Sequence, residues 1–488
     1  MDRNANRITL QQIARRAMIS RGLEPDFPTE AIAELREITS PTKCEPAQAK
    51  DLRRLLWCSV DNDDSLDLDQ LSYAEQLPNN KVRLLVAIAD VDALVTLQYS
   101  IDDHARQNTA SIYTVAQLFP MLPEKLSTDL TSMRMGEDRC AVVVEMVVGE
   151  DGAVQQSDVY RATVFNHAKL QYESLGDWLE GSGSIPLEVR KVEGLAENIQ
   201  LQDRIAQKMK ELRYEHGALE FETIEAKPVF EGDALSEMKA ELKNRAKSLI
   251  EDFMIAANGA TARYLEDKNF PSLRRVVRTP KRWDRIVELA SENGFLLPEI
   301  ANSKSLSTYL KYIKQNDPGH FVDMSISVLK LLGSGEYVVE IPGSTSEGHF
   351  GLAVKDYTHS TAPNRRYPDL VTQRLLKSAI AGLSVPYAVE QLEEIARHCT
   401  MKEDDVRKVE RQVEKSAMAM LMKSRIGEVF EAIVTGASPK GTWVRLYHPH
   451  AEGKLVDGYK GLEVGQKLKV RLIQIDIEEG FIDFERVG

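Results

Sequence analysis

Several features that would tie this chain to a special environment are scarce in its sequence. No apolar run approaches the roughly 18 residues that cross a membrane, and no apolar secretory core follows the first seven residues. The four cysteines, Cys44, Cys58, Cys140 and Cys399, stand far apart and form no CxxC pair. We therefore expect a reduced, cytoplasmic protein with no zinc knuckle and no membrane contact.

Basic residues are also fewer than acidic ones, with 62 Lys and Arg against 75 Asp and Glu. The formal net charge is −13, which argues against a protein that coats nucleic acid non-specifically. A locally basic channel remains compatible with this value, because phosphate binding depends on local charge. With 43% apolar and 28% charged residues, the 488-residue chain has the composition of a soluble globular protein of two to four domains.

The sequence is rich instead in one kind of acidic turn. Five aspartates fall within residues 61–69. In an extended segment Asp67 and Asp69 share one face, and we expect Leu66 and Leu68 to point into a core. Asp61 can fold back onto the same face through the turn. Carboxylates this close repel one another unless a cation lies among them, and hard oxygen ligands suit Mg²⁺ or Mn²⁺. The turn therefore predicts a divalent-metal site for phosphate chemistry.

Two other interpretations of this turn compete with the metal site. An exposed loop of Asp, Asn and Ser is commonly only solvated. A calcium loop of the EF-hand type fails on position, because Leu66 stands where glycine is needed and Ser72 where the bidentate glutamate belongs.

Three further segments suit a nucleic-acid ligand. A polar loop before a helix, residues 358–369, holds Arg365 and Arg366, whose guanidinium groups can grip phosphate oxygens. Residues 273–283 form a basic patch that includes Arg278 and ends on Trp283. Residues 111–123 place Tyr113 ahead of a loop with two prolines. Each segment also has an interpretation without a ligand. The arginines of 358–369 can also be a surface pair bridged to carboxylates, the charges of 273–283 a solvated run, and Tyr113 a packing residue.

The periodicity predicts an α+β multidomain chain. Helical segments are expected at about 8–21 and 28–35, then mostly strands over 51–150, helices over 186–265, alternating segments near 325–358, and helices over 368–381 and 386–422. Five short strands after Gly427 predict a small closed barrel of the OB type. The predicted domains are a small helical module at 1–45, a mixed α/β domain at 50–424 and the barrel at 425–488.

From about residue 50 to the C-terminus, the chain resembles the RNase II / RNase R (RNB) family of 3′→5′ exoribonucleases. No single block is decisive, but six or more occur in the family's order. The blocks are Asp61, Asp67 and Asp69 of the metal motif, Val86–Asp90, Tyr113–Pro123, His216–Phe221, Ile250–Asn258, Thr358–Asp369 (the family's TSPIRRYPD), Glu410, and the glycines and Trp443 of an S1 barrel.

The resemblance implies a fold and a set of roles. It implies an RNB catalytic domain with a C-terminal S1 barrel, and processive hydrolysis of RNA from the 3′ end to nucleoside 5′-monophosphates. Asp69 and Arg365 would be catalytic, and Mg²⁺ (with Mn²⁺ as a substitute) would lie among Asp61, Asp67, Asp69 and Gln70. The residues implied to contact RNA are Tyr113, Arg278, Arg365, Arg366, Glu410 and Trp443.

The chain departs from the family's pattern at three places. Gln70 stands where the family has a fourth aspartate, Arg278 stands where the family has a stacking aromatic residue, and about fifty N-terminal residues replace two cold-shock barrels. We expect the N-terminal helices to be a plain helical cap or a helix-turn-helix-like module.

The expected partners are single-stranded RNA 3′ ends and, because the module is small, structured RNA as well; we expect a monomer. Two rival hypotheses stay open. A non-catalytic RNA-binding protein on the same scaffold would follow from the loss of a metal ligand at Gln70. A DNA-binding regulator is disfavoured, because the N-terminal helices carry few basic residues beyond Arg15 and Arg16.

Overall fold

The fold is described by a computed structural model. It describes residues 6–45, 47–222, 225–232, 234–241, 243–344, 347–438, 441–463 and 465–487. Within these ranges no helix combines the length and the apolar character needed to cross a membrane.

Twelve α-helices and eighteen strands make up the regular structure of the described ranges. The helices are α1 (Asn6–Ile19), α2 (Thr29–Glu37), α3 (Ser100–Asn108), α4 (Tyr172–Glu180), α5 (Leu187–Arg190), α6 (Leu195–Glu215), α7 (Arg245–Asp267), α8 (Trp283–Glu292), α9 (Ser303–Asn316), α10 (Phe321–Leu332), α11 (Tyr367–Ile380) and α12 (Val389–Met422). The strands are β1 (Lys50–Asp51), β2 (Cys58–Asp61), β3 (Gln70–Gln76), β4 (Val82–Ala89), β5 (Ile112–Tyr113), β6 (Leu118–Phe119), β7 (Asp138–Val148), β8 (Val154–Phe165), β9 (Ala168–Gln171), β10 (Glu225–Glu231), β11 (Ala234–Glu241), β12 (Ser272–Val276), β13 (Glu336–Glu340), β14 (Val429–Ser438), β15 (Gly441–Leu446), β16 (Glu452–Asp457), β17 (Lys467–Asp476) and β18 (Phe481–Val487).

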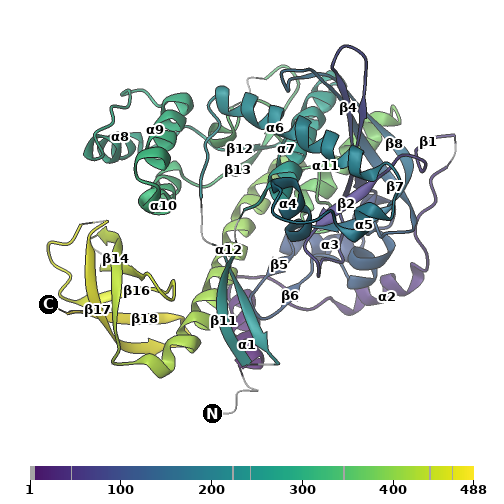
Figure 1. Cartoon of the computed structure of the whole chain (residues 1–488). Coiled ribbons are helices and arrows are strands. Elements are labelled where there is room, and N and C mark those ends of the chain that lie inside the picture. The colour runs from purple at the N-terminus through teal and green to yellow at the C-terminus, as the bar shows by residue number, and fades with distance from the viewer. Residues whose placement is uncertain are drawn as a thin grey trace.

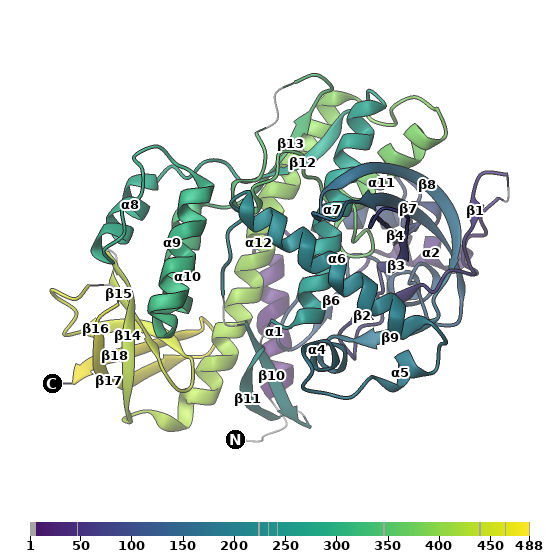
Figure 2. The same ribbon diagram turned by 45° about the horizontal axis from the view of Figure 1, so that its top comes forward.

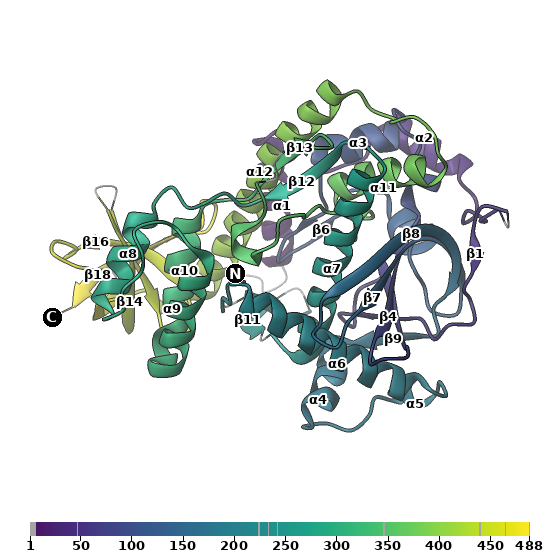
Figure 3. The same cartoon turned by 90° about the horizontal axis from the view of Figure 1, so that it is seen from above.

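A mixed seven-stranded sheet forms the body of the molecule, in the order β1-β8-β7-β4-β3-β2-β9. The outer pairs β1–β8 and β2–β9 are parallel, and the inner pairs are antiparallel. Strand β4 is buried on both faces, as its run of Val, Leu, Ala and Ile requires. Helices α6, α7 and α11 share the sheet's hydrophobic core. Figure 3 shows α6 and α7 beside the curved strands β7 and β8.

The long helix α12 joins this body to the C-terminal barrel (Figure 1). Strands β14 to β18 close in the order β14-β15-β16-β18-β17, and Met418, Ala419 and Met422 at the end of α12 belong to the barrel's core. Helices α8, α9 and α10 have a separate apolar core. In Figure 2 these three helices stand beside α12 and next to the barrel. The predicted mixed α/β body and the five-stranded barrel are thus present.

The two N-terminal helices pack onto different parts of the body. Helix α1 contacts α12, whereas α2 contacts α3. The buried residues of α1 belong to a cluster with α12, and Ala31 of α2 belongs to the core of the sheet. The boundaries 1–45, 50–424 and 425–488 stay predictions, and residues 1–5 of the first segment lie outside the described ranges.

The sequence patterns misled at three places. A two-stranded hairpin, β10–β11, interrupts the region expected to be helical. Helix α10 occupies the start of the region expected to alternate, and only β13 there is a strand. Leu66 is 62% exposed rather than part of the core, because the chain is still in the turn at that residue, whereas Leu68 is buried as expected.

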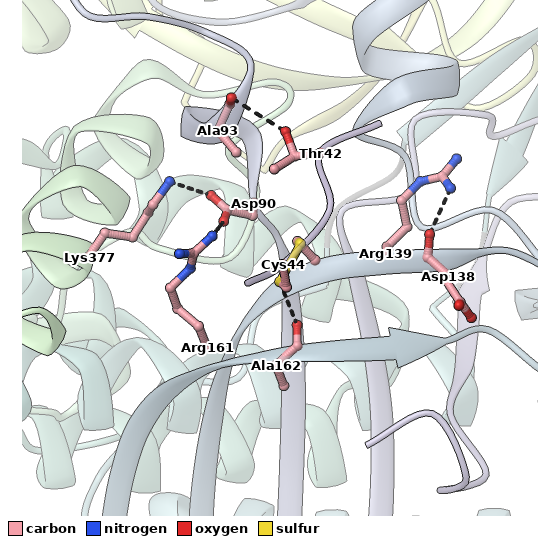
Figure 4. The surroundings of a disulfide bond; sticks show 10 residues. Thr42, Cys44, Asp90, Ala93, Asp138, Arg139, Arg161, Ala162 and Lys377 are labelled. Carbon is pink, nitrogen blue, oxygen red and sulfur yellow. Dashed lines mark hydrogen bonds and ion pairs between the residues drawn. A yellow bond between two sulfur atoms is a disulfide. The ribbon is translucent and has the colours of Figure 1, made fainter. Parts of the chain in front are cut away.

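Two cysteines that are distant in sequence meet beside the sheet. Cys44 and Cys140 form a disulfide with Cα atoms 5.5 Å apart, next to the Asp90 carboxylate, which pairs with Lys377 and Arg161 (Figure 4). Cys58 and Cys399 are buried thiols. The expectation of four reduced cysteines is therefore wrong for this pair, because the linker before β1 runs across the start of β7.

Candidate active site

The acidic turn leaves the sheet at the end of β2 and returns to it at β3. Asp61 is the last residue of β2, and its Oδ1 accepts hydrogen bonds from Asn62 N and Ser65 Oγ at 2.8 and 2.9 Å. The bonds close a compact turn. Asp69 is 2% exposed and stands immediately before β3. Asp67 is half-buried, and Leu68 between them is anchored in the core. The alternation therefore turns both aspartates away from the core of the sheet, as predicted.

The arginine loop before α11 meets this turn. Asp369, in the first turn of α11, accepts bonds from Ala362 N at 2.9 Å and from Arg366 Nη2 at 2.7 Å, which fixes the shape of the loop. Asn364 N then donates to Asp69 Oδ1 at 2.9 Å, and Arg365 Nε donates to Asp69 Oδ2 at 3.2 Å. The Arg365 side chain keeps 43% of its surface exposed, so the guanidinium group faces the solvent side of the cluster.

A third segment completes the cluster. Ser111 N donates to Arg365 O at 3.0 Å. This bond joins the residue just before β5 to the arginine loop. Tyr113 OH donates to Asp67 Oδ2 at 3.2 Å, and Tyr113 N donates to Glu410 Oε1 of α12 at 2.9 Å. Tyr113 is 47% exposed, which leaves its ring available to a planar partner.

Burial disfavours negative charge at the centre of this cluster. It raises the pKa of Asp69 to about 7, although Arg365 opposes the shift. Burial also raises the pKa of the Asp67 carboxyl group. A divalent cation would offset this cost by compensating the carboxylates, and three carboxylates supply the hard oxygen donors that Mg²⁺ prefers. The donor set of Asp61, Asp67 and Asp69 therefore suits such an ion by its chemistry, although the three carboxylates do not all place an oxygen within 4.8 Å of one another.

The remaining predicted residues lie at varying distances from this cluster. Gln70 is the first residue of β3 and is half-buried beside Asp69 in the chain. Arg366 is turned toward Asp369. Arg278 is exposed beyond β12 and pairs with Glu336 and Glu347. Trp443 lies on β15 of the barrel, on the far side of α12. The structure thus brings Asp61, Asp67, Asp69, Tyr113, Arg365 and Glu410 together and leaves Arg278 and Trp443 elsewhere.

A second acidic cluster has the tighter spacing. Glu266, Glu340 and Asp356 place one carboxylate oxygen each within 4.8 Å of the others, the only such triad found among the described residues. Arg274, 1% exposed, lies among them, with its guanidinium nitrogens 2.8 Å from Glu340, 3.6 Å from Glu266 and 3.9 Å from Asp356. This positive charge already occupies the place that a cation would take. We therefore interpret the triad as a structural ion-pair group.

Two contributors to the site, Asn364 and Tyr172, were missed in the sequence. Asn364 supplies the backbone N–H to Asp69, and its side-chain Oδ1 accepts from Thr131 Oγ1 at 2.5 Å. Asn364 replaces the isoleucine of the family block, but its bond to Asp69 is made by the backbone and cannot be read from the residue type. Tyr172 begins α4, and burial raises the pKa of its phenol, with Asp61 adding to the shift. No pattern around Tyr172 pointed to the site.

A basic cavity lies between α10, α12 and the barrel. It has a volume of about 300 Å³. Its charged or titratable lining is Lys330, Arg411, Glu414, Lys415, Arg445, His450 and Glu452. Cations thus outnumber carboxylates there in a chain whose net charge is negative, and this is the kind of local basic surface that the composition left open.

Comparison with known families and structures is consistent with this arrangement. Residues 49–382 match the RNB domain, and residues 428–487 match the C-terminal S1 domain of RNase II-type exonucleases. The chain belongs to the RNB family. Curated relatives include Ribonuclease R 1 of Lactococcus lactis, 27% identical over 96% of this chain, and Ribonuclease R of Vibrio cholerae, 30% identical over 95% of it. The chain spans 60% of the length of each of these two RNB-family relatives.

Solved structures share the RNB fold over nearly the whole chain. The apo form of Mycoplasma genitalium RNase R superposes with a TM-score of 0.87 at 23% identity, over 99% of this chain and 78% of that one. Yeast Ssd1, described as a pseudonuclease, superposes with a TM-score of 0.70 at 16% identity, over 95% of this chain and 58% of that one. The fold therefore occurs both in a ribonuclease and in a protein without nuclease activity.

Proposed function

We propose that the chain is a hydrolytic 3′→5′ exoribonuclease that acts processively and releases nucleoside 5′-monophosphates. The observation that carries the proposal is the junction of the acidic turn with the arginine loop, where the Arg365 guanidinium and the Asn364 N–H converge on the buried Asp69 carboxylate, while Tyr113 of a third segment donates to the neighbouring Asp67. Nuclease sites of this kind combine a carboxylate metal site with a cation facing the phosphate. Membership of the RNB family supports the same activity.

In this proposal Asp61, Asp67 and Asp69 would hold Mg²⁺, or Mn²⁺ in its place, with Gln70 as a neutral oxygen donor. When bound, the ion supplies an activated water and neutralises charge on the phosphate. Arg365 faces the scissile phosphate and stabilises the charge that develops on it. Tyr113 stacks on the terminal base and keeps the strand in line, and Glu410 holds the Tyr113 backbone.

A cavity lined by cationic side chains offers a path for the incoming RNA strand. The cavity lined by Lys330, Arg411, Lys415 and Arg445 offers cations beside the barrel that bears Trp443. Together with Arg278 and Arg366 these residues would contact the backbone or bases of single-stranded RNA. We further propose that the protein acts as a monomer and that it works in the cytoplasm.

A time course on 5′-labelled single-stranded RNA tests the proposal. With Mg²⁺ we expect a descending ladder of products, with EDTA none, and with the Asp69→Asn variant shortening that is slower by about 100- to 1,000-fold. A 3′-phosphate-blocked RNA of the same sequence checks the polarity. Shortening that persists in EDTA, or that runs at a near-normal rate in Asp69→Asn, would refute the assignment of the site.

The second candidate is a non-catalytic RNA-binding protein. The observation that favours it is Gln70, which removes one acidic ligand from the family's set, together with the existence of a pseudonuclease on the same fold. Binding of RNA without shortening, in both Mg²⁺ and Mn²⁺, would establish this alternative. The reverse substitution, Gln70→Asp, should then restore cleavage if Gln70 alone is responsible.

Structured RNA is a further expected substrate. A structure of Mycoplasma genitalium RNase R is described as a complex with double-stranded RNA, and its TM-score to this chain is 0.86. An RNA hairpin with a 3′ single-stranded tail tests whether the protein degrades duplex RNA as well as single strands. Products that continue through the duplex support the expectation, whereas a sharp stop at the junction contradicts it.

A further inference from the structure

Helix α1 packs against the β5–β6 hairpin and α12, two elements that carry residues of the proposed site. Tyr113 belongs to the hairpin β5–β6, and Glu410 to α12. Helix α1 shares one hydrophobic cluster with both elements. The cluster includes Leu10, Ile13, Ala14, Ala17 and Met18 of α1, Ile112 and Phe119 of the hairpin, and Val406, Val409, Val413 and Ala417 of α12. Figure 2 shows α1 running alongside α12.

The hairpin depends on this backing for its position. Each of its strands is only two residues long, and an isolated two-stranded hairpin is marginal in water even when it is longer. Ile112 is fully buried in the α1 cluster, while Tyr113, the next residue, is 47% exposed. Because side chains alternate along a strand, packing at Ile112 decides where the Tyr113 ring points.

The turn after α1 is also tied to the site by hydrogen bonds. Glu24 N donates to Asn108 Oδ1 and Asn108 Nδ2 donates to Glu24 O, both at 2.8 Å. Lys402 of α12 donates to Gly22 O at 2.6 Å. Asn108 ends α3, so the N-terminal turn holds the chain at the point where it leaves α3 for the hairpin.

The segment that follows Asn108 bonds to the arginine loop. Thr109 O accepts from Tyr367 N at 2.8 Å, and Ser111 N donates to Arg365 O at 3.0 Å. The same few residues therefore contact the N-terminal turn on one side and the backbone of Arg365 on the other. A continuous path of packed and bonded groups joins α1 to both Tyr113 and Arg365.

We propose that α1 and the turn at residues 20–24 form a positioning element for the proposed 3′-end site, with Ile13 and Asn108 as positioning residues. This inference rests on the proposed function for its catalytic consequence, but the structural coupling stands apart from it. The alternative use of α1, as a nucleic-acid surface, is disfavoured by its basic residues. Arg15 pairs with Asp26 and Arg16 pairs with Glu478, so both charges are already matched.

The test compares two identical substitutions in one helix. Ile13→Ala removes packing from the cluster, whereas Ile19→Ala changes a side chain that is 63% exposed. In Ile13→Ala we expect faster hydrogen exchange at the amides of Ser111 and Tyr113, kcat on RNA lower by about 10- to 100-fold, and a changed final product length. KM should change less than kcat. Ile19→Ala should match the wild type, and Ile13→Val should recover most of the loss.

A second variant keeps the inference testable if Ile13→Ala does not fold. Asn108→Ala removes the two hydrogen bonds to Glu24 and the contact with His104 Nε2 without touching the hydrophobic cluster, and Asn316→Ala, at the exposed end of α9, is its matched control. Wild-type exchange at Ser111 and Tyr113 with wild-type kcat in a folded variant would overturn the inference. If the wild-type protein shortens no RNA, the proposed function fails, and the exchange measurement still decides whether α1 supports the hairpin.

Discussion

Two groups of three carboxylates with an arginine, one around Arg274 and one around Asp69, differ in where the arginine lies. Around Arg274 the acids Glu266, Glu340 and Asp356 close over a guanidinium group that is 1% exposed. Around Asp69 the arginine stands at the edge, with Arg365 43% exposed. The first group encloses its arginine among the acids, whereas the second leaves its arginine open to solvent.

Close spacing of acidic side chains is therefore a poor guide to a metal site. The tighter triad already contains its counter-charge, whereas the looser one leaves buried carboxylates whose pKa values are raised by burial. A buried acid that is costly to ionise gains most from an added cation. We therefore expect the Arg274 group to contribute to stability and the Asp69 group to function.

The largest expected effect is on stability. Arg274→Met leaves three carboxylates without their buried partner and should lower the free energy of unfolding by about 3–5 kcal/mol, measured by urea denaturation. Arg278→Met is the matched control, because Arg278 also pairs with two glutamates but its side chain is 48% exposed. The control should lose at most about 1 kcal/mol. Equal losses of unfolding free energy in the two variants would show that the buried Arg274 is no more important for stability than the exposed Arg278.

The second effect is on catalysis. Asp69→Asn should lower the rate of RNA cleavage by about 100- to 1,000-fold, because it removes a charged ligand and the partner of Arg365. RNA affinity and the urea midpoint should stay close to the wild type, since the burial of this charge is already unfavourable. Near-normal turnover in Asp69→Asn would show that the functional cluster lies elsewhere.

The third effect is a pH dependence of stability near β12. Burial lowers the pKa of His349 to about 4 from its ordinary 6.5, and Arg275 adds to the shift. Between these values the unfolded chain binds a proton that the folded chain does not, so this contribution is complete above pH 6.5 and is lost as pH falls. The loss should be about 2 kcal/mol at pH 5 relative to pH 7.5.

Urea denaturation of the wild type and of His349→Gln at both pH values isolates this contribution from that of the carboxyl groups. Glutamine can still accept the Leu352 N–H that His349 accepts. The variant should show a smaller loss of stability on acidification. Parallel curves for the two proteins would mean that His349 titrates normally.

The smallest effect on rate is expected at Tyr113. Tyr113→Ala should change the length of the final product while changing the initial rate only a few-fold, because base stacking of about 1–3 kcal/mol matters most when few nucleotides remain bound. Tyr113→Phe, which removes only the bond to Asp67, should keep the wild-type product. An unchanged end product in Tyr113→Ala would exclude it from the proposed role.

Much of the architecture followed from local patterns. The burial of β4, the long helix ending at Met422 and the glycine-punctuated barrel are each visible in a short window of sequence. The ordered motifs also indicated which distant residues would meet, and the structure places Asp69 beside Arg365, 296 positions later. Here the resemblance to a family supplied what periodicity cannot, namely the pairing of remote segments.

The rest depends on tertiary contacts that leave no local signature. The pairing of Cys44 with Cys140 arises because a linker crosses β7. The bond from Asn364 N to Asp69 is made by the backbone, which carries no sequence signal. The β10–β11 hairpin, placed against α1 and α12, lies in a stretch where charge obscured the alternation. In each case packing against a distant element decided the outcome.

The comparison between the two acidic clusters is tested most directly by Mn²⁺ binding, followed by electron paramagnetic resonance in the wild type, Asp69→Asn and Glu340→Gln. Mn²⁺ is a hard divalent ion that accepts the same carboxylate ligands as Mg²⁺. We expect the bound signal to be lost or weakened at least tenfold in Asp69→Asn and kept in Glu340→Gln. Loss of the ion in Glu340→Gln with retention in Asp69→Asn would contradict the assignment and place the metal at the Arg274 group.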